Sequence, residues 1–137
     1  MWWTYALLSA FFASCTAILA KVGVKGINSD LATAIRTLFI LLIAWGIVFA
    51  RKESSGLALI SSNNWLFIGL SGIATGLSWI FYFKALQLGN VSQVAPVDKL
   101  SVALTIFLSV VLLHEVVSVK VLLGALLIVG GSLIIIL

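Results

Sequence analysis

Charged residues are scarce in this chain of 137 residues: eight are Lys or Arg and four are Asp or Glu, which is 9% in all. Soluble globular proteins carry about 25% charged residues, so an ordinary water-soluble domain is excluded. Cysteine and proline occur once each, which excludes a disulfide framework and argues against a disordered chain. No run of basic residues exists to bind a polyanion, so we expect no nucleic-acid partner. With a mean hydropathy of +1.28, the class that remains is a polytopic membrane protein.

Side chains that carry catalytic chemistry are equally few. One His, one Cys and four carboxylates show neither metal-ligand spacing nor a nucleophile paired with a base. No glycine-rich loop precedes a helix to bind phosphate. We therefore expect neither an enzyme nor a bound cofactor or metal.

Apolar stretches long enough to cross a bilayer follow one another along the chain. A hydrocarbon core about 30 Å thick needs about 20 apolar residues in a helix, and an open strand would leave its backbone groups unpaired there. Five such stretches occur: residues 2–20, 31–50, 65–83, 94–113 and 119–137. The sequence therefore predicts an all-α fold, a single domain over residues 1–137 with five transmembrane helices. Short connections make consecutive helices antiparallel neighbours, and Ser29 or Asp30 is the expected N-cap of the second span.

Polar side chains recur on one face of two consecutive spans, at intervals of three or four residues. The third-span stripe is Ser71, Thr75, Ser78 and Tyr82, with Trp79 beside it. The fourth-span stripe is Asp98, Ser101, Thr105 and Ser109. Small hydroxyl residues also pack helices closely and bond to carbonyls of their own helix, which is the simpler explanation of any one of them. Two stripes on consecutive spans nevertheless favour a polar groove.

Ionisable residues near the span ends gather on one membrane face, because the spans alternate in direction. They are Lys21, Arg36, Lys84, Asp98 and Lys99. The long Lys and Arg side chains can reach the interface, whereas Asp98 is too short and needs a partner, either Arg36 or an adjacent lysine. A structural ion pair and a substrate or proton site both fit Asp98.

Cations are nearly balanced across the membrane. One face carries Arg51, Lys52 and Lys120, and the other carries Lys21 and Lys25 plus up to three residues near the span ends. A protein that inserts in one orientation usually shows a clearer excess on its cytoplasmic side. We therefore expect dual topology, in which both orientations occur.

Several segments resemble a known family. Residues 85–89 (ALQLG), 94–101 (VAPVDKLS), 113–115 (LHE) and 124–131 (GALLIVGG), with 17–21 (AILAK) and 32–37 (ATAIRT) before them, look like an EamA domain of the drug/metabolite transporter superfamily. Typical members of that family carry two five-helix units in one chain, related as inverted repeats. This chain holds one unit and resembles the short single-domain subgroup. This departure from the family pattern leaves open how the second half is supplied. An antiparallel homodimer would supply it, and the near balance of cations permits such a dimer.

The resemblance also implies a secondary transporter that moves a small metabolite, such as an amino acid, by alternating access, with the first four spans lining the pathway. Cations on the lined face favour an anionic substrate. The residues expected to bind it are Lys21, Arg36, Thr75, Ser78, Trp79, Tyr82, Lys84, Asp98, Lys99, Ser101 and Thr105. The expected location is the cytoplasmic (inner) membrane of a bacterium or archaeon. The alternative is a non-transporting membrane subunit, or a protein that handles a lipid headgroup with the same cations.

Overall fold

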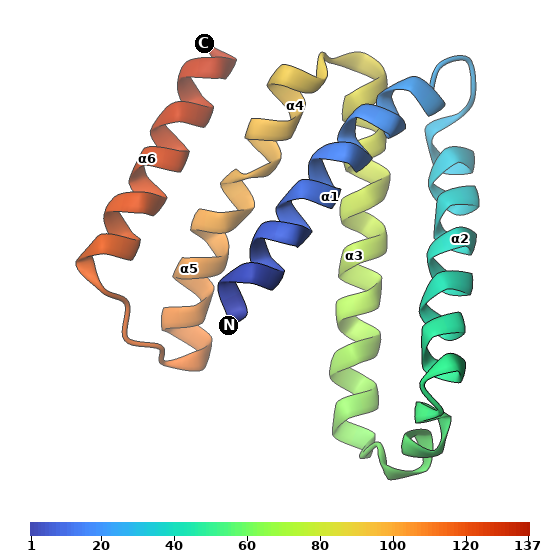
Figure 1. Ribbon diagram of the computed structural model, residues 1–137. Helices are drawn as coiled ribbons and strands as arrows, with labels where there is room; N and C mark the ends of the chain where they lie inside the picture. Colours follow the sequence, from blue (N-terminus) through green and yellow to red (C-terminus); the bar gives the residue numbers. More distant parts are fainter. The chain divides into compact units, whose positions relative to one another are not determined.

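The computed structural model describes residues 1–137, which form helices and no strands. The elements are α1 (Trp2–Gly23), α2 (Ser29–Ala50), the 3-10 helix η1 (Glu53–Leu59), α3 (Ser62–Leu88), α4 (Val91–Asp98), α5 (Leu100–Leu113) and α6 (Val119–Ile136), as drawn in Figure 1. Five segments are long and apolar enough to cross a membrane, with α4 and α5 forming the fourth together. The all-α fold with five transmembrane helices is confirmed.

Helix ends differ from the predicted spans because apolar character marks the bilayer core rather than the end of the helical backbone. α3 is the clearest case, since it runs from Ser62 to Leu88 where residues 65–83 were predicted. The expected N-cap of the second span was wrong. Asn28 caps α2, and its Oδ1 accepts hydrogen bonds from the backbone N–H groups of Asp30 (2.7 Å) and Leu31 (3.3 Å), which satisfies two donors that a helix start leaves open.

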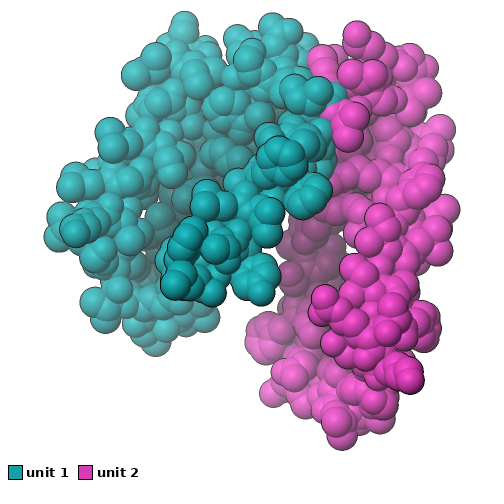
Figure 2. All heavy atoms as spheres, viewed as in Figure 1, with its two compact units in different colours: residues 1–18, 88–137 teal, residues 19–87 magenta.

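The chain comprises two compact units, coloured separately in Figure 2: residues 1–18 with 88–137 form unit 1, and residues 19–87 form unit 2. In unit 2, α2 and α3 run side by side in opposite directions and are joined through η1 (Figure 1). A cluster of buried side chains lies where the end of α1, the start of α2 and the end of α3 meet. Its members are Val24, Ala32 and Phe83, with Ala20 and Tyr82 packed against them.

In unit 1, α6 packs against both α4 and α5. The fourth span was predicted as one continuous helix, but it is interrupted at Lys99. Pro96 lies inside α4 and lacks a backbone N–H, so a proline there weakens the helical hydrogen-bond ladder. The Pro96 carbonyl accepts from the Lys99 backbone N–H (3.0 Å) and from the hydroxyl of Ser132 in α6 (2.9 Å). α6 therefore helps to hold the interrupted helix in place.

Candidate functional site

Arg36 lies about two turns into α2, and its guanidinium group is placed over two aromatic rings of α3. The Cζ atom is 4.0 Å from the centroid of the Trp79 ring and 5.2 Å from that of Phe83. These two rings are four residues apart on one helix, so they face the same side. The negative face of an aromatic ring attracts a cation at this distance. α3 therefore holds the Arg36 side chain by its rings.

The charge of Arg36 is not neutralised within unit 2. The carboxylates of this unit are Asp30 and Glu53, and neither forms an ion pair with Arg36. A guanidinium group is planar and has five N–H donors at its edge. Neither carboxylate of the unit occupies these donors, so they remain available to a planar anion. This arrangement suits a carboxylate or a phosphate, which the guanidinium fork can bind through two hydrogen bonds.

The two aromatic residues predicted for the site on the third span, Trp79 and Tyr82, make different contacts. Trp79 is half-buried and faces Arg36. Tyr82 is half-buried too, but its ring meets the Phe83 ring edge-on at 6.4 Å and packs against the buried cluster. Trp79 is the member of the predicted pair whose ring lies under the Arg36 guanidinium. Phe83 supplies the second ring, a residue that the sequence analysis did not select because an apolar side chain at a span end has no distinguishing signal.

The connection between α1 and α2 is tied to the end of α3 by side-chain hydrogen bonds. The Lys21 ammonium donates to the carbonyl of Leu86, whose side chain is fully buried. The Gln87 side-chain amide donates to the carbonyls of Val24 (3.3 Å) and Ile27 (2.5 Å). A cation at the last carbonyls of a helix is favourable, because those groups lack partners and carry the negative end of the helix dipole. Lys21, which was predicted to bind substrate, thus also makes a structural contact with the end of α3.

Gln87 makes contacts at this end of the unit that the sequence did not predict. It lies within the segment 85–89 that carries the resemblance, but an amide near a helix end is usually solvated and gives no signal of its own. Its two hydrogen bonds fix the end of α3. Gln87 follows Phe83 by four residues and Trp79 by eight on this helix. It therefore helps to position the rings under Arg36.

The remaining predicted residues of unit 2 do not join this cluster. Lys84 is exposed and forms no ion pair. Ser78 is exposed, as is Thr75, whose hydroxyl donates to the carbonyl of Ser71 (2.8 Å) one turn earlier on α3. This is the bond to its own helix that offers the simpler explanation of the third-span stripe. Within unit 2 the structure brings Lys21, Arg36, Trp79 and Tyr82 to the same end.

In unit 1 the fourth-span stripe begins at the interruption between α4 and α5. The Asp98 carboxylate lies 3.4 Å from the ammonium of Lys99, with the two side chains 37% and 55% exposed. An adjacent lysine is thus the partner of Asp98, one of the two expected alternatives. An exposed pair of this kind contributes little stability. Farther along, the Thr105 hydroxyl donates to the Ser101 carbonyl (2.8 Å), again within one helix.

No group of three or more His, Cys, Asp and Glu side chains is placed to hold a metal ion. The site is instead a cationic group held by aromatic rings at one end of a helical unit in a multi-pass membrane protein.

Comparison with known proteins identifies the family of the chain. The whole chain, residues 1–137, matches the EamA-like transporter family, and the chain belongs to that family. A relative from Sinorhizobium sp, "Uncharacterized transporter in cobO 3'region", is 47% identical over 132 residues, which cover 96% of this chain and 94% of the relative. No solved structure matches the chain significantly. The family membership confirms the resemblance and supports a role as a membrane transporter.

Proposed function

We propose that the chain transports a small metabolite with an anionic group, a carboxylate or a phosphate, and that Arg36 binds this group. The observation that carries the proposal is the guanidinium stacked 4.0 Å from the Trp79 ring with no carboxylate of its unit beside it. A cation within a transmembrane span costs free energy, so its presence needs a compensating role. An amino-acid-like substrate fits through its carboxylate.

Stacking prepares Arg36 for this task. A free arginine side chain loses about 2 kcal/mol of rotamer entropy when it is fixed. The rings of Trp79 and Phe83 already restrict the group before a ligand arrives, so less entropy is lost on binding. Lys84, which is on the same part of α3 and unpaired, adds positive potential that attracts an anion.

We infer that the chain is a single five-helix domain and that a second copy, inserted in the opposite orientation, completes the pathway. The chain alone buries few side chains: Ala17 is the only buried residue of α1, and α5 has none. The near balance of cations on the two faces permits both orientations. Two inverted units that rock about a shared site would give alternating access, and Thr75, Ser78, Asp98, Lys99, Ser101 and Thr105 are proposed to line the path.

We place the transporter in a cytoplasmic (inner) membrane. Its five apolar helices suit a hydrocarbon core about 30 Å thick. The coupling of transport to a proton would involve Asp98, the carboxylate nearest to the interruption of the fourth span.

A binding assay on the purified protein tests the role of Arg36. Ligands with a carboxylate or phosphate are screened by thermal shift, because a ligand that binds only the folded state raises its apparent stability. Hits are then measured with Arg36→Lys and Arg36→Gln. A hydrogen bond to a charged group contributes about 1.5–3 kcal/mol, so we expect Arg36→Gln to lose about tenfold to 100-fold in affinity and Arg36→Lys to lose less.

Lys120→Gln is the matched control, because Lys120 is an exposed cation at the start of α6. It should bind the hits as the wild type does, and flux into proteoliposomes should follow affinity. Anionic ligands that bind equally well to Arg36→Gln and to the wild type would contradict the proposal.

A further inference from the structure

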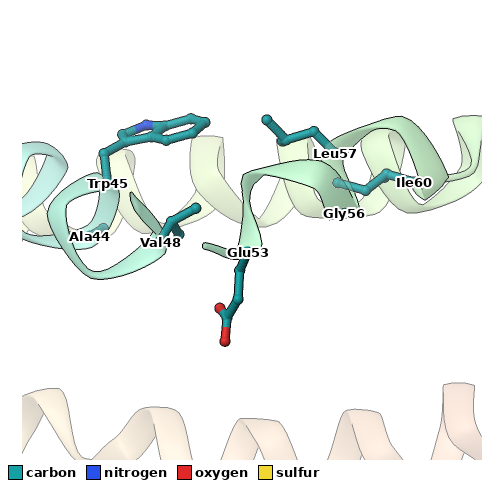
Figure 3. A pocket seen from close by; sticks show the side chains of 7 residues that line it. All are labelled: Ala44, Trp45, Val48, Glu53, Gly56, Leu57 and Ile60. Atoms are coloured by element: carbon teal, nitrogen blue, oxygen red, sulfur yellow. The ribbon is translucent and has the colours of Figure 1, made fainter. Parts of the chain in front are cut away.

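A groove lies in unit 2 at the opposite end of α2 from Arg36, between the last turns of that helix and η1 (Figure 3). Its volume is about 310 Å³. Trp45 and Val48 of α2 form one wall, and Leu57 and Ile60 face them from η1 and the residue after it. Gly56 leaves the space beside it open, since a side chain added there would meet no atom within 4 Å. The groove is therefore an apolar surface with room for a hydrocarbon chain.

The groove lies where a bilayer passes from hydrocarbon to headgroups, because α2 spans the membrane and ends at Ala50. The Trp45 ring packs against that of Phe49 with centroids 5.6 Å apart, which restricts its orientation. Tryptophan is enriched at this depth of the membrane. Trp45 and Leu57 remain 39% and 40% exposed, so the chain itself does not fill the space between them.

Two cations lie in the sequence between the groove-lining residues of α2 and those of η1. Arg51 and Lys52 follow the last residue of α2, are exposed and form no ion pair. The turn that carries them is fixed by backbone hydrogen bonds from their N–H groups to the carbonyls of Ile47 (2.9 Å) and Phe49 (3.1 Å). Glu53 comes next and is one of the residues that line the groove. Figure 3 shows its carboxylate pointing away from the ring of Trp45. The short segment that joins α2 to η1 therefore carries two cations and one carboxylate next to an apolar groove.

We propose that this groove binds one anionic phospholipid, with an acyl chain against Trp45 and Leu57 and the phosphate at Arg51 and Lys52. The pairing of apolar walls with adjacent cations matches the two parts of such a lipid. A free phosphate would gain nothing from the apolar walls, and a zwitterionic lipid would gain less from the cations. A basic residue near the membrane surface favours anionic lipid by about fivefold, so two cations give a preference of about fivefold to 25-fold.

Tryptophan fluorescence in vesicles tests the proposal. A variant that keeps Trp45 and carries Phe at the other four tryptophans is reconstituted into vesicles of phosphatidylcholine and phosphatidylglycerol, with bromine on the acyl chains of either lipid as quencher. We expect brominated phosphatidylglycerol to quench Trp45 well beyond its mole fraction. Vesicles with the same lipids in both leaflets make the readout independent of the orientation of the protein.

A variant that keeps only Trp65 is the control, because Trp65 lies at the other end of the same connection, is 56% exposed and does not line the groove. Its quenching should follow the mole fraction of brominated lipid. In the Trp45 variant, Arg51→Gln should lower the preference for the anionic lipid by about fivefold. Gly56→Leu should fill the groove and reduce quenching by both lipids.

Either of two results would overturn the proposal. One is quenching of Trp45 with the same lipid preference as Trp65. The other is a preference that survives both Arg51→Gln and Gly56→Leu, which would mean that Trp45 reports only the general surface of the membrane.

Discussion

The stacking of Arg36 on Trp79 predicts a measurable coupling between these two residues in the free energy of unfolding. Trp79→Leu removes the aromatic face and keeps an apolar side chain, and Arg36→Met removes the charge and keeps much of the length. Each change alone alters burial as well as the interaction. The double-mutant cycle cancels those separate effects and leaves the pairwise coupling.

The expected coupling free energy between Arg36 and Trp79 follows from their distance and their burial. A cation within about 6 Å of a ring centroid is attracted by about 0.5–1 kcal/mol at an exposed site and by about 2 kcal/mol when desolvated. Arg36 and Trp79 are both half-buried and 4.0 Å apart, which places the pair between these limits. The Phe83 ring, at 5.2 Å, retains part of the attraction when Trp79 is lost. We therefore expect a coupling of about 1 kcal/mol.

The assay is reversible unfolding of the four proteins in mixed micelles, followed by circular dichroism of the helices. A second cycle that pairs Arg36→Met with Trp45→Leu is the control, because Trp45 lies near the other end of α2. Distant sites add within about 0.3–0.5 kcal/mol, so the control coupling should fall below that value. A coupling between Arg36 and Trp79 no larger than the control would refute the interaction and, with it, the argument that the rings prepare Arg36 for a ligand.

Three further outcomes are expected. Native mass spectrometry in mild detergent should show twice the mass of 14.6 kDa, and a C-terminal reporter should be active on both sides of the membrane; an active monomer in a single orientation would contradict the dimer. Asp98→Asn should reduce transport with little loss of expression. If the variant transports normally between about pH 5.5 and 8, Asp98 has no role beyond its ion pair with Lys99. Ser132→Ala should lower the free energy of unfolding by about 0.6 kcal/mol, because it removes the hydrogen bond to Pro96, whereas Ser109→Ala, which loses only a bond to Ile106 in its own helix, should have a smaller effect.

The sequence predicted the helices because hydropathy alone decides which segments cross a bilayer. It also predicted that Lys21 and Arg36 lie at the same end of the molecule, since alternating spans bring the end of one helix to the start of the next. The contacts in unit 2 agree, with Lys21 reaching Leu86 and Arg36 reaching Phe83. These properties depend on order along the chain and not on packing.

The partner of Arg36 could not be predicted in the same way. Which ring it meets depends on the rotation of α2 against α3, and packing sets this rotation without a periodic signal in the sequence. The N-cap was missed for a related reason. Asn28, Ser29 and Asp30 are all good capping residues, and only the backbone conformation of Asn28, with ψ at 136°, selects it. The hydrogen bond from Ser132 of α6 to the Pro96 carbonyl is likewise a packing contact that the sequence does not reveal.

Charges argue for a second copy more strongly than the polar stripes do. Thr75 and Thr105, on the two stripes, bond to carbonyls of their own helices, so they can face lipid without leaving a hydroxyl unpaired. Arg36 differs from them, because the rings that hold its guanidinium do not neutralise its charge and a charge within a span costs free energy in hydrocarbon. A polar pathway between two copies would hydrate this charge and admit the anion that neutralises it. The proposed dimer and the proposed anionic substrate therefore rest on the same residue, and the binding assay on Arg36 variants bears on both proposals.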